Sequence, residues 1–262
     1  MFKFCNLYSG STGNASLLIT DKAKILIDAG ESAKKIEEAL KENNLEVKDL
    51  DGIIVTHEHT DHTKALNMLS TKYEIPIYAN KETFEAFEKL TGKELKNKRE
   101  FKIKKEFSIK DINIKAFNVP HDAANPCGFN IFYKDKKISV TTDLGHVNKE
   151  VFENLKNSKF LMIESNYDPN ILRCSRYPYY LKERISGPLG HLSNDNTGEL
   201  IIKLLDSGLE KVELAHLSKE NNFPELAYKT VVEKFIENKI STDNIGIDIA
   251  NNKLERKIID LE

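Results

Sequence analysis

The sequence predicts an α/β fold in which helices and strands form two similar halves, packed as an αβ/βα sandwich. Helical and strand patterns alternate along the 262 residues, with no linker and no break in composition. Two segments alternate apolar and polar residues around short polar turns, which is typical of hairpins, and a histidine-rich segment directly follows an apolar run. We therefore expect one domain over residues 1–262, without an inserted domain, and a site at one sheet edge between the halves.

The first half contains four segments with clear patterns. Ser32 to Asn44 begins with a polar cap and continues as an amphipathic helix. Ile53-Ile54-Val55 is a short apolar run that predicts a buried strand. A helix-like stretch from Thr63 to Ser70 follows it, and Lys81 to Leu90 predicts a further helix.

The second half begins with the two predicted hairpins, at Phe101 to Phe117 and at Phe129 to Val140. The elements expected after them, in order, are a strand over 159–163, a helix over 193–207, a strand over 212–215, a helix over 224–239, and closing strands over 245–249 and 254–259. This order of elements completes the second half of the sandwich.

The composition is that of an ordinary globular protein, with 40% hydrophobic and 31% charged residues and a net charge of −2. The first residues, Met1 to Asn6, lack the apolar segment of a signal peptide, and no apolar run reaches the length of a membrane span. Cys5, Cys127 and Cys174 are scattered and form no disulfide framework or CxxC motif. We expect a cytoplasmic protein without a membrane partner; the sequence does not specify protein partners.

The segment after the apolar run Ile53-Ile54-Val55 is rich in metal-ligand residue types. His57 and His59 alternate at the end of an extended strand, so both side chains point to the same side. Asp61 and His62 are adjacent and open the helix-like stretch. Two ligand pairs on a bending backbone predict two divalent ions side by side. Histidine with aspartate suits zinc better than magnesium, and the same ligands also accept manganese.

The pattern His-x-His-x-Asp-His after an apolar strand resembles the central motif of the metallo-β-lactamase fold superfamily, whose fold is a four-layer αβ/βα sandwich. Other segments resemble further parts of that family's pattern, in the same order: the Gly/Ser turn and strand 9–19, the strand 25–30 with its Asp-x-Gly exit, and the short motifs around His121, Asp143 and His216. The resemblance implies a first metal held by His57, His59 and His121, and a second held by Asp61, His62 and His216. Asp143 would bridge the two ions.

The resemblance can be narrowed to a nuclease branch. Gly190-His191-Leu192-Ser193-Asn194 and Ala215-His216-Leu217-Ser218 resemble the paired histidine motifs of that branch. Segments 164–168, 177–185 and 217–222 are similar to the YycJ (WalJ) subfamily, and the similarity runs from about Phe2 to Asn222. This implies a bacterial cytoplasmic nuclease that degrades double-stranded DNA from 5′ to 3′.

The implied mechanism is hydrolysis of a phosphodiester. Two ions would lower the pKa of a bridging water to about 7, which gives hydroxide at neutral pH. Asp61 or Asp143 would orient this hydroxide. We expect His191, which is outside the ligand set, to stabilise the phosphorane or to protonate the leaving 3′-oxygen. The alternative for His191 is a structural role.

Basic and aromatic residues are interleaved just before His191, in a segment whose proline makes a place in the core difficult. The substrate contacts expected there are Arg173, Arg176, Tyr177, Tyr179, Lys182 and Arg184. Ser11, Asn14 and Asn194 are further candidates for hydrogen bonds to phosphate, although turns use these residue types for backbone reasons as well. We expect the basic run 89–105 to be solvated surface.

Alternative functions remain open at this stage. One is a hydrolase of a small ester, thioester or cyclic phosphodiester, which an enclosed apolar pocket would favour. Another is a protein that binds nucleic acid without catalysis and keeps metal for stability. A ribonuclease is also open, because the preference for DNA over RNA rests on the resemblance.

Overall fold

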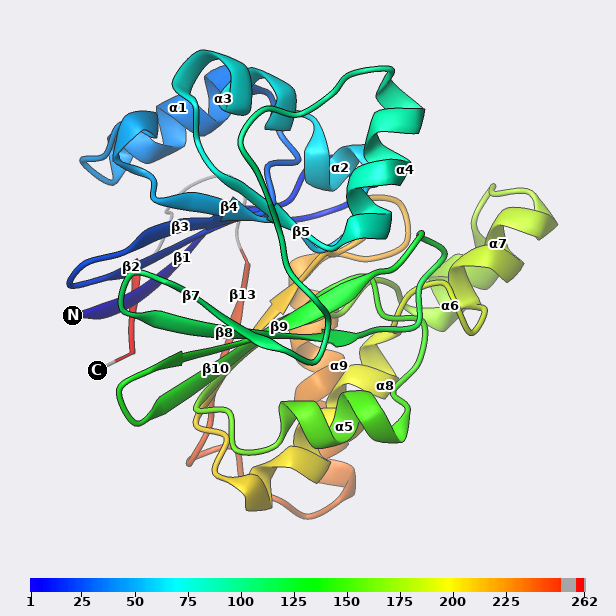
Figure 1. Ribbon diagram of the computed structural model, residues 1–262. Coiled ribbons are helices and arrows are strands. Elements are labelled where there is room, and N and C mark those ends of the chain that lie inside the picture. Colours follow the sequence, from blue (N-terminus) through cyan, green and yellow to red (C-terminus); the bar gives the residue numbers. More distant parts are fainter. Residues whose placement is uncertain (251–257, 262) are drawn as a thin grey trace.

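The computed structural model describes residues 1–250 and 258–261. Within these residues, two seven-stranded sheets lie face to face, and helices cover the outer face of each sheet (Figure 1). The layers are therefore helix, sheet, sheet, helix, which confirms the predicted αβ/βα sandwich.

The first sheet has the strand order β14-β1-β2-β3-β4-β5-β6. The strands from β14 to β3 pair antiparallel, and those from β3 to β6 pair parallel. Its strands are β1 (Phe2–Tyr8), β2 (Ala15–Thr20), β3 (Lys24–Ile27), β4 (Gly52–Ile54), β5 (Ile77–Ala79), β6 (Lys98–Glu100) and β14 (Ile258–Asp260). The helices of this half are α1 (Ala33–Glu42), the 3-10 turn η1 (Val47–Asp49), α2 (Thr60–Thr63), α3 (Leu66–Tyr73) and α4 (Lys81–Thr91).

The second sheet has the strand order β13-β12-β11-β10-β9-β8-β7, antiparallel from β7 to β10 and parallel from β10 to β13. Its strands are β7 (Glu106–Ile109), β8 (Ile112–Asn118), β9 (Cys127–Tyr133), β10 (Lys136–Thr141), β11 (Phe160–Glu164), β12 (Lys211–Ala215) and β13 (Gly246–Ile249). Its helices are α5 (Lys149–Leu155), α6 (Pro169–Cys174), α7 (Tyr179–Ser186), α8 (Asn194–Leu204), the 3-10 turn η2 (Leu205–Ser207) and α9 (Pro224–Glu237).

The apolar core lies in three layers, one between the sheets and one under each set of helices. Phe4 of the first sheet meets Phe160 of the second, with ring centroids 5.0 Å apart. Every residue of β2 is buried, because this strand has apolar neighbours on both faces. Each large apolar side chain so buried stabilises the fold by about 1.5–3 kcal/mol.

Several predicted elements need correction. The basic and aromatic segment before His191, for which no helix was predicted, spans parts of two helices, α6 and α7. No residue of α7 is buried, so its sequence lacks the apolar periodicity that indicates a helix. The helix-like stretch at 63–70 is divided between α2 and α3. Of the closing strand expected over 254–259, residues 254–257 lie outside the described residues, and β14 begins at Ile258.

The strand directions place the ends of several distant segments at one edge of the two sheets. Strands β3 and β4 are parallel neighbours in the first sheet, and β10, β11 and β12 are parallel neighbours in the second. The carboxyl ends of parallel strands meet at the same sheet edge, which is where open α/β proteins bind ligands. Among the helices of the described residues, none is long and apolar enough to span a bilayer.

We predict that Gly30→Ala destabilises the protein strongly. A Cβ atom at Gly30 would lie 1.6 Å from the backbone oxygen of Asp61, so the loop after β3 and helix α2 would have to move apart. We expect the free energy of unfolding to fall by more than about 3 kcal/mol in urea denaturation. Gly92→Ala is the control: its Cβ meets no atom within 4 Å and its φ is +65°, so it should cost about 1 kcal/mol. Equal costs for the two variants would contradict this account.

Candidate metal centre

The predicted ligands of the first ion come together although they lie on separate strand ends. His57 and His59 follow β4, and His121 follows β8. The three imidazole rings face one another edge to face, with centroid separations of 4.6, 5.2 and 5.1 Å. His57 and His121 are buried and His59 is partly exposed. Three imidazoles at this spacing can bind one divalent ion.

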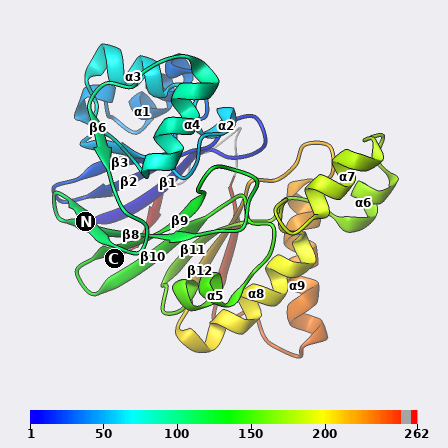
Figure 2. The ribbon, with the colours of Figure 1, turned by 45° about the vertical axis from the view of Figure 1, so that its right-hand side comes forward.

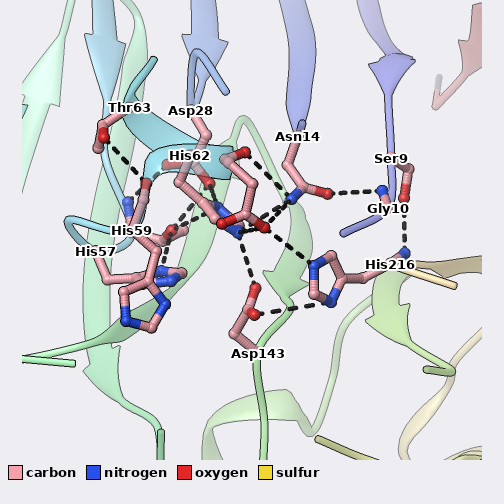
Figure 3. A network of polar contacts seen from close by, with 12 residues as sticks. Ser9, Gly10, Asn14, Asp28, His57, His59, His62, Thr63, Asp143 and His216 are labelled. Atoms are coloured by element: carbon pink, nitrogen blue, oxygen red, sulfur yellow. Dashed lines mark hydrogen bonds and ion pairs between the residues drawn. The ribbon is translucent and has the colours of Figure 1, made fainter. Parts of the chain in front are cut away.

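The predicted ligands of the second ion form an adjoining cluster. Asp61 Oδ2 lies 3.5 Å from His62 Nε2 and 3.5 Å from His216 Nε2. Asp143, which follows β10, has Oδ2 3.0 Å from His62 Nε2 and Oδ1 3.5 Å from His121 Nε2. One carboxylate therefore reaches both clusters, as the bridging role requires. Figure 3 shows its contacts with His62 and His216 of the second cluster.

Buried ring nitrogens without hydrogen bonds show that these residues fit metal ions. Within the described part of the chain, the Nε2 atoms of His57, His121 and His216 are buried and make no hydrogen bond. A buried polar atom left unsatisfied costs about 1–3 kcal/mol, so three in one site call for a common partner. Neutral imidazole nitrogens around carboxylates are the ligands that a divalent cation such as zinc prefers.

The other ring nitrogen of each buried ligand histidine is held by a fixed acceptor. His62 Nδ1 donates to Asp28 Oδ2 at 2.8 Å, and His121 Nδ1 donates to the carbonyl of Gly190 at 3.0 Å. His57 Nδ1 lies 3.0 Å from Thr56 Oγ1, whose hydroxyl donates to Asp28 Oδ2. These contacts fix the tautomer and orientation of each ring, so that Nε2 faces the metal position.

Three residues of the site have backbone angles that non-glycine residues rarely adopt. Asp28, Asp143 and His216 have φ values of 60°, 54° and 54°. Each directly follows the end of a strand or lies within two residues of it. Such a left-handed conformation costs about 1–3 kcal/mol and persists only where the surrounding structure enforces it. The chain therefore turns sharply at these strand ends, and the turns bring the side chains to the shared edge.

The electrostatic environment differs between the two clusters. Burial lowers the pKa of His57 well below its usual value and also lowers the pKa of His121, so both rings are in the neutral form that binds metal. Burial also opposes the charged form of His62 and His216. For these two rings the nearby carboxylates, with Asp143 first, outweigh burial and raise the pKa well above its usual value. A cation bound in the second cluster would displace these protons.

Glu164, at the end of β11, joins the metal centre to His191. Its Oε1 accepts hydrogen bonds from Nδ1 of His191 and from Nδ1 of His216, each at 2.7 Å. Its Oε2 accepts from the backbone N–H groups of Leu144 and Leu192. Burial alone would raise the pKa of Glu164, but the His191 and His216 imidazoles outweigh burial and lower it to about 2. The carboxylate therefore stays ionised and fixes both rings.

Five of the predicted metal ligands and His191 line one cavity of about 230 Å³. The residues that line it are Ser11, His59, Asp61, His121, Asp143, Asn166, Tyr177, Leu181, Arg184, Ile185, His191, His216 and Ser218. The cavity is therefore bounded by the metal centre and His191 on one side and by helix α7 on the other.

A family model for the β-lactamase superfamily domain matches residues 23–205.

The chain belongs to the metallo-β-lactamase superfamily.

Curated proteins of this superfamily are similar over most of the chain. The exodeoxyribonuclease WalJ of Streptococcus pneumoniae serotype 2 is 40% identical over 251 residues, which are 95% of this chain and 91% of that protein. The exodeoxyribonuclease YycJ of Bacillus anthracis is 38% identical over 229 residues, 87% of each chain. The family predicted from the sequence motifs is thereby confirmed.

A solved metallo-β-lactamase structure has the same fold. The crystal structure of the metallo-β-lactamase fold protein YhfI from Bacillus subtilis superposes with a TM-score of 0.73 and 15% sequence identity. The superposition covers 99% of this chain and 100% of that one. The predicted fold class is confirmed.

The predicted substrate residues fall into three groups. Ser11, Tyr177 and Arg184 line the metal cavity, and Arg184 Nε donates to Asp122 Oδ2 at 2.6 Å. Three others line a separate hollow on the far side of α7, namely Arg173, Tyr179 and Lys182. Arg176 is exposed and lines neither space. Four of the six basic and aromatic residues therefore lie outside the metal cavity.

The two predicted asparagine contacts are corrected by the structure. Asn194 is fully buried, and its amide bonds the Ser165 hydroxyl and Asn222. Asn14 is buried as well, and its Nδ2 lies 3.3 Å from Asp61 Oδ2 and 3.1 Å from His62 Nε2. Neither amide lines the metal cavity, so these residues hold loops and ligands in place and cannot bind phosphate as expected.

The role of Asp28 was not predicted from the sequence, and one cysteine lies close to the site. Asp28 bonds His62 and Thr56, and its position directly after an apolar strand is the sequence feature that could have identified it. Cys127, one of the three cysteines scattered in the sequence, lies beside the histidine motif in the fold, with its Sγ 3.4 Å from the carbonyl of Thr56. Burial raises the pKa of the Cys127 thiol well above its usual value, so it stays protonated under the site.

We predict that Asp28→Asn weakens the binding of the second ion. The substitution removes the charge that orients His62, and loss of such a partner lowers metal affinity by about 10- to 100-fold. Competition with a chromogenic zinc chelator would measure the two dissociation constants. Asp111→Asn is the matched control, because Asp111 also accepts a threonine hydroxyl, that of Thr20, on the turn between β7 and β8. Wild-type affinities in both variants would show that Asp28 has no part in metal binding.

Proposed function

We propose that this protein is a dinuclear-metal phosphodiesterase, and specifically a 5′-to-3′ exonuclease on double-stranded DNA. The observation that carries the proposal is the position of Asp143, which reaches both ligand clusters in a cavity that also contains His191. Relatives that are 38–40% identical over most of the chain are named exodeoxyribonucleases, which favours DNA over RNA. The 5′-to-3′ direction follows the resemblance of the sequence motifs.

Two divalent ions fit the donor set, three imidazoles on one side and a carboxylate with two imidazoles on the other. We propose zinc as the native metal, since nitrogen-rich sites favour it, and manganese as a working substitute. When bound, the ions would make hydroxide available at neutral pH and neutralise the charge on a phosphate. The residues of the chain supply the rest of the chemistry.

Asp61 and Asp143 both line the cavity, so their carboxylates are placed to orient an attacking water. His191 is held by Glu164 through Nδ1, and its ring lines the same cavity with a partly exposed side chain. Burial opposes protonation of His191, but Glu164 outweighs burial and raises its pKa. We assign it the proton that the leaving 3′-oxygen takes up.

The character of the cavity favours a phosphodiester over a small apolar ester. Its lining is mainly polar and charged, and it includes the Arg184 guanidinium, which can pair with phosphate. An enclosed apolar pocket, which a small-ester hydrolase would use, is not what these residues form. We further propose that residues 1–262 act as one domain, because both sheets supply ligands and share the central core, and that the protein works on DNA in the cytoplasm.

The direct test offers the purified protein three substrates, with zinc or manganese: 5′-phosphorylated linear duplex DNA, circular duplex DNA and single-stranded RNA. We expect nucleotide release from linear DNA alone. His191→Ala should lower kcat by about 10²- to 10⁴-fold, because a proton donor is lost, while both ions remain bound. Asp61→Ala should lose activity together with the second ion.

His146→Ala is the matched control for the histidine substitution. His146 is an exposed histidine three residues after Asp143, and its Nδ1 lies 2.8 Å from the carbonyl oxygen of Pro188. It should leave the rate unchanged. Turnover of a small ester or cyclic phosphodiester, with every polymer left intact, would overturn the proposed function; cleavage of RNA alone would replace DNA by RNA as the substrate.

A further inference from the structure

Helix α7 separates two hollows in the protein surface. One is the metal cavity, whose wall on this side is made by Tyr177, Leu181, Arg184 and Ile185. The other, which we call the outer hollow, has a volume of about 470 Å³ and is lined by Tyr167, Pro169, Leu172, Arg173, Tyr179, Lys182, Glu183 and Ser186. Both hollows therefore use side chains of one short helix.

The spacing of these residues places the two sets on opposite faces of α7. Residues 179, 182, 183 and 186 follow the i, i+3, i+4, i+7 pattern of one helical face, and residues 181, 184 and 185 lie on the opposite one. None of the eight residues of α7 is buried. In Figure 2, α6 and α7 project from the body of the protein beside α8 and α9. The helix thus stands as a partition with an open space on each side.

The outer hollow has the chemistry of a single-strand binding surface. Tyr179 is 74% exposed, and Tyr180, next to it on the helix, is 73% exposed. Two cations accompany them, Arg173 and Lys182, and Lys182 Nζ donates to the Arg173 carbonyl at 2.7 Å, which fixes α7 against α6. Glu183, the acidic residue among the described residues that line the hollow, accepts a hydrogen bond from the Tyr179 hydroxyl at 2.7 Å. Aromatic faces for bases and cations for phosphates are what proteins use to bind an unpaired strand.

The metal cavity is too small for a base pair. Its volume of about 230 Å³ is below the ~300 Å³ at which pockets for small organic ligands begin. A strand can enter it by its end, but its paired partner must go elsewhere. Stacking of one base on an aromatic side chain has a free energy comparable to one stacking step of duplex DNA, so it can offset the opening of an end pair.

We propose that helix α7 parts the two strands at the end of a DNA duplex. The strand to be cut passes along the Arg184 face to the metal centre, and the complementary strand lies in the outer hollow, where it stacks on Tyr179 and pairs with Arg173 and Lys182. This inference rests on the proposed function, since it takes duplex DNA as the substrate. It adds an element that acts on the strand that is not cut.

The test compares the rates of nucleotide release from a blunt 5′-phosphorylated duplex and from the same labelled strand without its complement. In Tyr179→Ala we expect the ratio of the duplex rate to the single-strand rate to fall about tenfold, because the ring that holds the complementary strand is lost. Tyr179→Phe, which keeps the ring and loses the hydroxyl, should restore the wild-type ratio. Tyr228→Ala is the matched control, an exposed tyrosine on α9 that lines neither hollow.

The outcomes separate this inference from the proposed function. A selective loss on the duplex in Tyr179→Ala, with rescue by phenylalanine, supports strand parting. A ratio that stays at the wild-type value, or equal slowing on both substrates, overturns strand parting and leaves the exonuclease intact. Absence of nucleotide release from any DNA by the wild-type protein would overturn the proposed function and this inference together. Since Tyr179 is exposed, circular dichroism of Tyr179→Ala should match that of the wild type.

Discussion

The electrostatic balance around Asp143 is the constraint on which the site depends. This carboxylate is buried between two imidazole clusters, with His62 Nε2 at 3.0 Å and His121 Nε2 at 3.5 Å. Burial of an ion costs several kcal/mol unless opposite charge and hydrogen bonds compensate for it. Two divalent ions would supply that charge and would also satisfy the buried ring nitrogens of the described residues that make no hydrogen bond. The same charge would attract the phosphate of a nucleic acid, so stability and function have one physical cause.

The fold brings strand ends from both sheets to one edge, and this places the histidine ligands around Asp143. The left-handed turns at Asp28, Asp143 and His216 and the close approach at Gly30 are costly local features, and all of them lie at this edge. A second layer of acceptors then fixes the rings. Asp28 holds His62, and Glu164 holds both His216 and His191. A shift of Glu164 would thus disturb a metal ligand and the proposed proton donor at once.

The parts of the structure that could be predicted are those that a local sequence pattern determines. The ligand residues directly follow apolar strands, so the parallel strand ends bring them together, and α1 with its Ser32 cap was expected for the same kind of local reason. Helix α7 was not expected, because a helix with no buried residue has no apolar stripe. Asn194 was misread because its burial and a contact made over 28 residues decide its role.

The number of ions bound per chain tests the central claim most directly. Native mass spectrometry of the chelator-treated protein, titrated with zinc, would count them. We predict that two ions bind to the wild-type chain. Asp143→Ala removes the shared carboxylate, so it should lower the affinity for both ions. A single bound ion in the wild type, or an Asp143→Ala variant that keeps two ions with unchanged affinity, would contradict the account.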